Sequence, residues 1–402
     1  MLSRGVAWSV ALAATFTMTV SYIDRSTFAF LAPTVTGELG ISEAAYGWLG
    51  SAFSIAYLVS TPLAGWWIDR VGARRGLVVS VIVWSAVAAM HALAPGFWTL
   101  FALRIALGVA EGPSFPGASQ TVQRALPPAD RPRGFGVLFS GSSIGGLLVP
   151  PLAGMLFAFA GWRFAFVGTA VIGLVWIPVW ILLTGRRAVR AQLDAAPELG
   201  AGETRVPMFA LMRHPLMLRG LIAVLSAAPP IGFMLLWGSK YLATLGVSQT
   251  GAAKYLWLPP LCLDVGAIVF GDLAARRRSK TPARGLVAIA MMLAAAIGLL
   301  PLVDDPWPAT ALLGVAMAGG GALYTLVTAD LLARMPAASV SSAGGLLAAA
   351  PSFALIVLGP LVGEAVDHYH HYDGATIVIG LLAIPGSLVW IAWKPADRFS
   401  AR

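Results

Sequence analysis

Long apolar runs separated by short polar connections fill almost the whole chain. Each run has about 20 residues or more, which is enough for a helix to cross a hydrocarbon core of about 30 Å. The pattern therefore predicts twelve transmembrane segments. They are residues 6–33, 43–68, 76–95, 97–124, 134–159, 161–184, 214–243, 249–273, 283–303, 306–333, 339–366 and 372–393.

These segments are predicted to be α-helices, because a backbone in lipid must find its hydrogen bonds within its own segment. The longest polar interruption follows the sixth run and divides the runs into two sets of six. We therefore expect an all-α membrane protein with twelve transmembrane helices in two pseudo-symmetric six-helix bundles. The bundles are residues 1–185 and 214–402, joined by a cytoplasmic linker, residues 186–213.

The composition agrees with lipid as the solvent. Of the 402 residues, 58% are hydrophobic and 11% are charged, whereas about a quarter of the residues in a soluble domain are charged. The net charge of +9 does not indicate nucleic acid, because the basic residues lie in short connections rather than on one domain. The single cysteine, Cys262, excludes an intramolecular disulfide. No signal-peptide cleavage pattern follows the first run, so we expect it to remain as a helix.

The basic residues predict the orientation in the membrane. They gather in or beside alternate connections, as Arg70, Arg74, Arg75, Arg124, Arg131, Arg133, Arg186, Arg187, Arg190, Arg205, Arg213, Arg276, Arg277, Arg278, Lys280, Arg284 and Arg334. The other connections carry mainly acids, namely Glu38, Glu43, Asp304, Asp305, Asp367 and Asp373. Because positive connections stay in the cytoplasm, both termini and the central linker are expected there.

Two runs carry charges in their interior. Asp24 and Arg25 are adjacent in the first run. In the fourth run, Arg104, Gly108 and Glu111 stand at i, i+4 and i+7 and share one helix face. An ionisable residue inside a membrane segment indicates a functional site, since burying its charge in lipid is unfavourable. Adjacent side chains diverge by about 100° around a helix, so Asp24 and Arg25 are not expected to pair.

The depths of these residues predict a different pairing. Asp24 and Arg104 lie at similar depths, so we expect them to meet across the first and fourth helices. Arg25 is then left in a watery cavity without a fixed carboxylate, which suits an anionic substrate. The alternative is an inert salt-bridge network that joins helices. Buried ion pairs stabilise proteins poorly, which favours the functional interpretation.

The connection after the second run contains a spaced motif, GWWIDRVGARRG (65–76). After the eighth run, FGDLAARRRSK (270–280) repeats an acid and an arginine cluster. An acid at a helix end can bind arginines and a neighbouring helix end, and so stabilise one of two arrangements of the helices. The alternative is topology alone, because any cytoplasmic connection is rich in arginine. The full spacing resembles the loop motif of the major facilitator superfamily. The gating candidates are Gly65, Asp69, Arg70, Gly72, Arg74, Arg75 and Asp272.

The chain also resembles a narrower group, the anion:cation symporter family. The likeness rests on Tyr22-x-Asp24-Arg25, on Arg104 to Glu111 with Gly108 and Gly112, and on GWRFAF (161–166). That family includes bacterial galactonate, hexuronate and glucarate importers and the sialin and vesicular glutamate transporters. The resemblance implies that Asp24 and Glu111 carry the coupled proton and that Arg25 grips the substrate carboxylate. It further implies that Tyr22 and Tyr57 line the pocket and that Arg104 responds to Asp24.

The C-terminal half departs from this family. Members of that family that bind polyhydroxy acids usually have an asparagine in the eleventh helix. This chain has small and apolar residues in that region (341–363). We therefore expect a less hydroxylated carboxylate, because unpaired polar groups on a ligand disfavour binding. Trp237, Tyr241 and Tyr324 complete the candidate substrate-binding residues, and the roles of Lys240 and Asp264 stay open.

Two further motifs have plain explanations. The glycines of GSSIGG (141–146) lie within a predicted helix and are expected to let another helix pack closely, not to bind phosphate. In DHYHHYD (367–373), three histidines stand between two acids. We expect a solvated external connection there rather than a metal site, since the spacing implies no ligand geometry.

The sequence therefore predicts proton-coupled uptake of a small organic anion, such as a mono- or dicarboxylate or a sugar acid. The alternatives are a proton-coupled efflux antiporter or anion exchanger and, from another class, a membrane-embedded enzyme or receptor. No nucleophile, metal cluster or cofactor motif supports the enzyme, so we expect no cofactor besides the proton as coupling ion. The expected partners are the anion and the lipid bilayer, not nucleic acid. We expect a monomer in a bacterial inner membrane.

Overall fold

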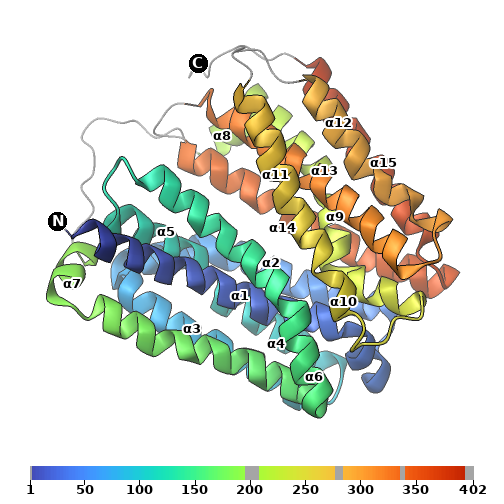
Figure 1. The fold of residues 1–402 in the computed structure, drawn as a ribbon, viewed down its shortest axis with the longest axis horizontal. Coiled ribbons are helices and arrows are strands. Elements are labelled where there is room, and N and C mark those ends of the chain that lie inside the picture. Colours follow the sequence, from blue (N-terminus) through green and yellow to red (C-terminus); the bar gives the residue numbers. More distant parts are fainter. Residues whose placement is uncertain (1, 195–207, 277–283, 336–339, 394–402) are drawn as a thin grey trace. The chain divides into compact units, whose positions relative to one another are not determined.

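The structure is a computed structural model that describes residues 2–194, 208–276, 284–335 and 340–393. Within these residues the chain is helical and contains no strand (Figure 1). The predicted Arg205, Arg277, Arg278 and Lys280 lie outside the described residues. The helices are α1 (Arg4–Leu39), α2 (Glu43–Val71), α3 (Ala73–Met90), η1 (His91–Leu93), α4 (Phe97–Glu111), α5 (Ser114–Ala125), α6 (Arg131–Thr184), α7 (Arg187–Leu193), α8 (Met208–Arg213), α9 (Pro215–Thr244), α10 (Ala253–Leu256), α11 (Leu258–Arg276), α12 (Arg284–Ala295), η2 (Ala296–Leu302), α13 (Pro306–Leu332), α14 (Val340–Tyr369) and α15 (Asp373–Ala392).

The described helices correspond to the twelve predicted segments. Nine of them are long and apolar enough to cross a membrane. The other three predicted segments are α2, the α4–α5 pair and the second part of α6. The backbone of α6 leaves helical geometry at Ala160 and Gly161, so this element is two helices joined at a kink. Gly161 has φ of 79°, a conformation that favours glycine.

Four predicted helices are not continuous α-helices in the described residues: the third ends in η1, the eighth divides into α10 and α11, and the fourth and ninth are also interrupted. The fourth run breaks after Glu111, because Pro113 has no N–H to donate to the preceding turn, and α5 begins at Ser114. Glu111 thus ends α4 rather than lying inside a straight helix. In the ninth run α12 changes to the 3₁₀ helix η2, which contains Pro301.

The contacts within the chain form two compact units. Unit 1 comprises residues 1–198 with 242–257, and unit 2 comprises residues 199–241 with 258–402. The segment 242–257 packs on unit 1, where the Gln249 amide donates to the Phe30 carbonyl at 2.7 Å and accepts from the Thr34 hydroxyl at 3.0 Å. Trp84, Trp176 and Trp180 lie in the buried core of unit 1.

Small residues allow the helices of unit 1 to approach closely. A Cβ on Gly141 or Gly145 would collide with the Thr15 or Thr19 carbonyl of α1. The Thr19 hydroxyl also donates to the Gly141 carbonyl at 2.9 Å. This confirms that the GSSIGG glycines serve helix packing, which in lipid depends on close contact rather than on the hydrophobic effect.

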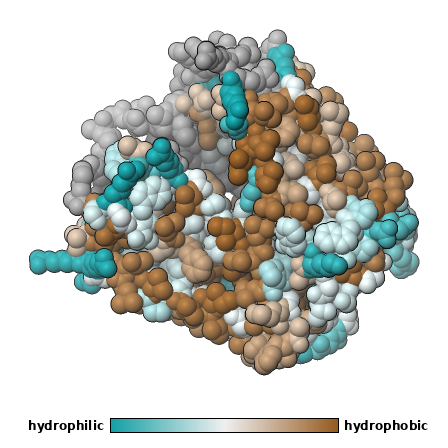
Figure 2. Space-filling view, viewed as in Figure 1, coloured by the Kyte–Doolittle hydropathy of each residue, from teal (hydrophilic) through white to brown (hydrophobic). Residues whose placement is uncertain are grey.

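Large apolar side chains are exposed along many helices. Trp98 and Phe159 are 77% and 80% exposed, and Leu182 is 75% exposed. Figure 2 shows broad hydrophobic areas on the visible face. In water such areas would promote aggregation, whereas in a bilayer they face lipid tails. The chain is therefore a multi-pass membrane protein.

Candidate functional site

The candidate site in unit 1 is built where α1, α2 and α4 meet. A Cβ on Gly108 of α4 would lie 2.9 Å from the Ala56 Cβ and 3.0 Å from the Tyr57 nitrogen, so only glycine permits this approach to α2. The Ser60 hydroxyl donates to the Gly108 carbonyl at 3.2 Å across the same contact. The glycine in the predicted motif thus brings α2 against the end of α4, where Glu111 lies.

Arg25 and Glu111 form the central ion pair of this site. The Arg25 Nη2 and Nε donate to the Glu111 Oε2 at 2.6 Å and 2.9 Å. The Glu111 side chain is fully buried and that of Arg25 is 15% exposed. The prediction that Arg25 has no fixed carboxylate is therefore wrong. Glu111 is the last residue of α4 and lies against α1, a pairing that sequence spacing did not reveal.

Ser21 is a third member of the pair that the sequence analysis missed. Its hydroxyl donates to the Glu111 Oε2 at 2.7 Å and accepts from the Arg25 Nη2 at 3.0 Å. Ser21 stands four residues before Arg25, and side chains at that spacing share a helix face. This spacing was the signal that could have identified it.

Aromatic rings surround the Arg25 guanidinium. Its central carbon lies 4.5 Å from the Tyr22 ring centre, 4.7 Å from that of Tyr57 and 5.0 Å from that of Phe53. Each ring attracts the cation through the negative charge of its face. Tyr22 and Tyr57, which the resemblance implies as pocket-lining residues, thus lie against Arg25, and Phe53 is an additional neighbour. The Arg25 Nη1 makes no hydrogen bond to any described residue.

Asp24 points to a different neighbour. It is 2% exposed, and neither carboxylate oxygen has a hydrogen-bond partner within the described residues. The side chain that approaches the carboxylate is Trp84 of α3, whose indole nitrogen is also buried without a hydrogen bond to a described residue. The divergence of Asp24 from Arg25 is as predicted. The predicted pair of Asp24 with Arg104 does not form in the described chain.

Arg104 is held by aromatic rings and one carbonyl. Its Nε donates weakly to the Leu49 carbonyl at 3.4 Å. The guanidinium carbon lies 4.6 Å from the Phe53 ring centre and 4.8 Å from that of Phe28. Phe53 therefore contacts both Arg25 and Arg104, and its ring offsets part of the repulsion between these cations. The Arg104 Nη1 is buried and has no hydrogen-bond partner among the described residues.

The predicted loop motif is organised differently from our expectation. Asp69 does not hold an arginine in the described chain; it accepts from the Gln120 amide of α5 at 2.8 Å, and the same amide accepts from the Ala73 N–H at 3.1 Å. Arg74 instead pairs with Asp194, just after α7, at 3.2 Å. Gln120 and Asp194 lie outside the motif, so its spacing does not predict these contacts.

The other motif residues have local roles. Gly72 has φ of 84°, which suits glycine, and joins α2 to α3. The Arg70 guanidinium lies 3.8 Å from the Trp66 ring centre. Gly65 faces Pro116 of α5, and Arg75 is exposed. In unit 2, Asp272 forms an exposed ion pair with Arg276, four residues later, at 2.7 Å.

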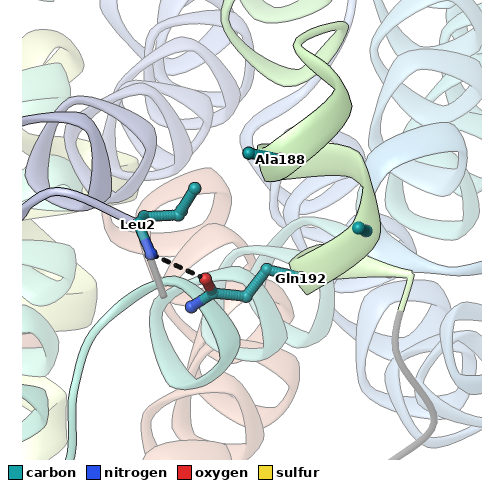
Figure 3. Close-up of a pocket in the computed structure, with 4 residues that line it drawn as sticks. Leu2, Ala188 and Gln192 are labelled. Carbon is teal, nitrogen blue, oxygen red and sulfur yellow. Dashed lines mark hydrogen bonds between the residues drawn. The ribbon is translucent and has the colours of Figure 1, made fainter.

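The first helix of the linker, α7, ties other parts of unit 1 together. The Gln192 amide accepts from the Leu2 N–H at 3.1 Å and donates to the Arg124 carbonyl at 2.8 Å. A cavity of about 500 Å³ lies beside this contact, lined by Leu2, Ala188, Ala191 and Gln192 (Figure 3). The lining is mostly aliphatic and holds no charge, so this cavity offers an organic anion no cationic partner.

The candidates in unit 2 lie apart in its structure. Trp237 and Tyr241 of α9 pack edge-on against Tyr372 at 5.9 Å and 5.7 Å between ring centres. Tyr324 of α13 packs on a separate core cluster. Arg219 was not predicted from the sequence; it is 3% exposed and donates to the Trp390 carbonyl at 2.7 Å and to Asp330 at 3.3 Å.

Comparison with known proteins identifies the group to which these features belong. A family model described as the Major Facilitator Superfamily matches residues 14–357. The chain is 29% identical to a hexuronate transporter of Bacillus subtilis (strain 168), with 92% of this chain and 91% of that protein covered. It is 25% identical to a D-galactonate transporter of Escherichia coli O6:H1, with 93% and 92% covered.

The solved structures agree on the fold. A bacterial homologue of the human lysosomal transporter Spinster, in an inward-facing and unoccupied conformation, matches with a TM-score of 0.79 and 18% identity. The match covers 98% of this chain and all of that one. At this identity the likeness shows the fold alone.

Proposed function

Because the chain belongs to the Major Facilitator Superfamily, we propose that it is a secondary transporter that carries a small organic anion together with a proton by alternating access. The observation that carries this proposal is the buried Arg25–Glu111 pair, which joins α4 to α1, a helix long and apolar enough to cross a membrane. Charges inside a membrane-spanning segment are energetically unfavourable, so their presence indicates a functional site. An arginine that can exchange one carboxylate for another has such a function.

The exchange follows from the donors on Arg25. While Glu111 is ionised, it occupies Nε and Nη2 of the guanidinium, and a substrate carboxylate has access to Nη1 alone. A proton on Glu111 removes its charge and weakens both bonds, because charge-assisted hydrogen bonds are about twice as strong as neutral ones. Arg25 can then bind the substrate carboxylate through two parallel N–H groups. Loss of the proton on the other side of the membrane reverses the exchange.

Asp24 is the second proposed proton site. Its carboxylate is buried without a hydrogen-bond partner in the described chain, and an isolated buried charge is strongly unfavourable. A proton removes that charge. Arg104, a buried cation without a carboxylate partner in the described chain, is proposed to respond to the charge on Asp24.

The substrate class is proposed from the site and the relatives together. The two named relatives above carry hexuronate and D-galactonate, and a third, from Bacillus subtilis, is a probable galactarate/D-glucarate transporter that is 26% identical. All of these substrates are carboxylates, as an arginine site requires. Hexuronates and aldonates are therefore the first substrates to test, with less hydroxylated carboxylates beside them because of the apolar segment 341–363.

Transport in reconstituted vesicles tests this proposal. We expect Glu111→Gln to lose accumulation driven by a pH gradient while it keeps counterflow, which moves no net protons. Arg25→Ala should lose both activities, because the carboxylate has lost its partner. Arg4→Gln is the control, since the Arg4 side chain is 71% exposed and pairs with Asp130 outside the site. If Glu111→Gln and Arg25→Ala both accumulate substrate as the wild type does, the proposal is wrong. Proton-driven export instead of uptake would identify an antiporter.

A further inference from the structure

The Ser21 hydroxyl donates to a side chain of another helix, whereas the neighbouring hydroxyls on α1 donate to backbone carbonyls, including that of Thr19, which reaches Gly141 of α6. The hydroxyls of Thr15, Thr17 and Thr27 donate to the carbonyl four residues back on the same helix. This is the usual bond of such a side chain within a helix. The Ser21 hydroxyl instead leaves its own helix and donates to Glu111 of α4 at 2.7 Å.

The directions of the Ser21 hydrogen bonds follow from the chemistry of its neighbours. Arg25 has only donors, so the Ser21 oxygen must accept from it. The hydroxyl hydrogen is then available to Glu111, which accepts while it is ionised. Ser21 is fully buried, so bulk water does not compete for these bonds. The hydroxyl thus stabilises the ionised carboxylate and holds Arg25 beside it.

The three donors all reach one oxygen of Glu111. Ser21 and both Arg25 nitrogens donate to Oε2, whereas Oε1 is buried and has no hydrogen-bond partner among the described residues. Oε1 is therefore the atom available to form an O–H bond with an incoming proton. The Ser21 hydroxyl can keep its bond to Oε2 when Arg25 leaves for the substrate.

We propose that Ser21 is a positioning residue that sets the pH of coupling, by stabilising ionised Glu111 and keeping its carboxyl group in place when Arg25 moves. This inference rests on the proposed function, because it assumes that Glu111 exchanges a proton during transport. Without the hydroxyl, the carboxylate loses one donor and accepts a proton at higher pH. The wild-type serine thus moves the midpoint of proton-driven uptake downward.

The pH dependence of uptake in vesicles tests this role through Ser21→Ala. We expect the pH of half-maximal uptake to rise by about one unit, the shift that corresponds to a lost hydrogen bond to a charged group. Counterflow should persist, because Arg25 remains. Ser21→Thr keeps a hydroxyl and should restore the wild-type midpoint. The matched control is Ser54→Ala, whose buried hydroxyl donates only to the Gly50 carbonyl of its own helix.

The outcomes separate this inference from the proposed function. An unchanged midpoint in Ser21→Ala, with pH dependence still abolished by Glu111→Gln, overturns the role of Ser21 and leaves proton coupling intact. An equal shift in Ser54→Ala also overturns it, because the effect would then come from packing. Wild-type uptake that does not depend on pH overturns both ideas. A melting temperature for each purified variant shows that it is folded.

Discussion

At the scale of single residues, the environment of Arg25 defines how it can bind a ligand. Three aromatic rings lie within 5.0 Å of the guanidinium carbon, and Glu111 occupies one edge of the group. A carboxylate must therefore approach along the edge that carries Nη1, or replace Glu111. This arrangement distinguishes the site from a solvated surface arginine, whose edges and faces are all open to water.

Phe53 is the ring that links the two buried arginines, and its removal should weaken substrate binding. A cation–π contact contributes roughly 0.5–2 kcal/mol, and Phe53 makes one with each of Arg25 and Arg104. We expect Phe53→Leu to lower the apparent affinity for the transported carboxylate about tenfold, measured by the substrate concentration at half-maximal counterflow. Phe159→Leu, on an exposed side chain, is the control. Equal affinities in the two variants would show that the ring does not support Arg25.

Sequence reasoning found the charged residues of this site but not their partners. Burial of a charge in an apolar run is visible in the sequence, as is the divergence of Asp24 from Arg25. The choice of Glu111 over Arg104 as a partner for α1 depends on how far each helix is rotated and on the break before Pro113. A difference of one residue in rotation moves a side chain by about 100°, and no sequence spacing settles it.

At the scale of helices, the contact between α2 and α4 depends on glycine. The Gly108 position faces the α2 backbone, whereas Gly136 on α6 has open space around it. We expect Gly108→Ala to separate the two helices, to reduce stability by about 1–3 kcal/mol and to impair transport, because Glu111 and Tyr57 move apart. Gly136→Ala should be neutral or slightly stabilising. Melting temperatures in detergent, together with counterflow rates, measure both effects. A Gly108→Ala variant as stable and active as Gly136→Ala would contradict the contact.

The helices themselves were predictable because so few backbone structures can cross a bilayer. Length and apolar content alone located the segments, and the structure places a helix over each of them. The interruptions were harder to predict, although Pro113 and Gly161 were visible in the sequence. Proline and glycine also occur inside continuous membrane helices, as Pro33 does in α1, so their presence does not identify a break.

At the scale of the whole molecule, the orientation in the membrane remains a prediction from the charges. Cysteine labelling tests it, starting from Cys262→Ala, which removes the single native thiol. A cysteine at Arg187 should react only with reagents that reach the cytoplasm, and one at His368 should react with impermeant reagents added outside. Both native side chains are exposed, so access does not limit the reaction. The opposite labelling pattern would reverse the orientation and the direction of proposed uptake.

In the proposed mechanism, carboxylate binding and proton binding are linked through Arg25 and Glu111. Calorimetric titration of the purified protein with its transported carboxylate, in two buffers of different ionisation enthalpy, counts the protons taken up on binding. We predict net proton uptake by the wild type near neutral pH and a smaller uptake by Glu111→Gln, with binding retained in both. Binding to the wild type without any proton uptake would contradict the account.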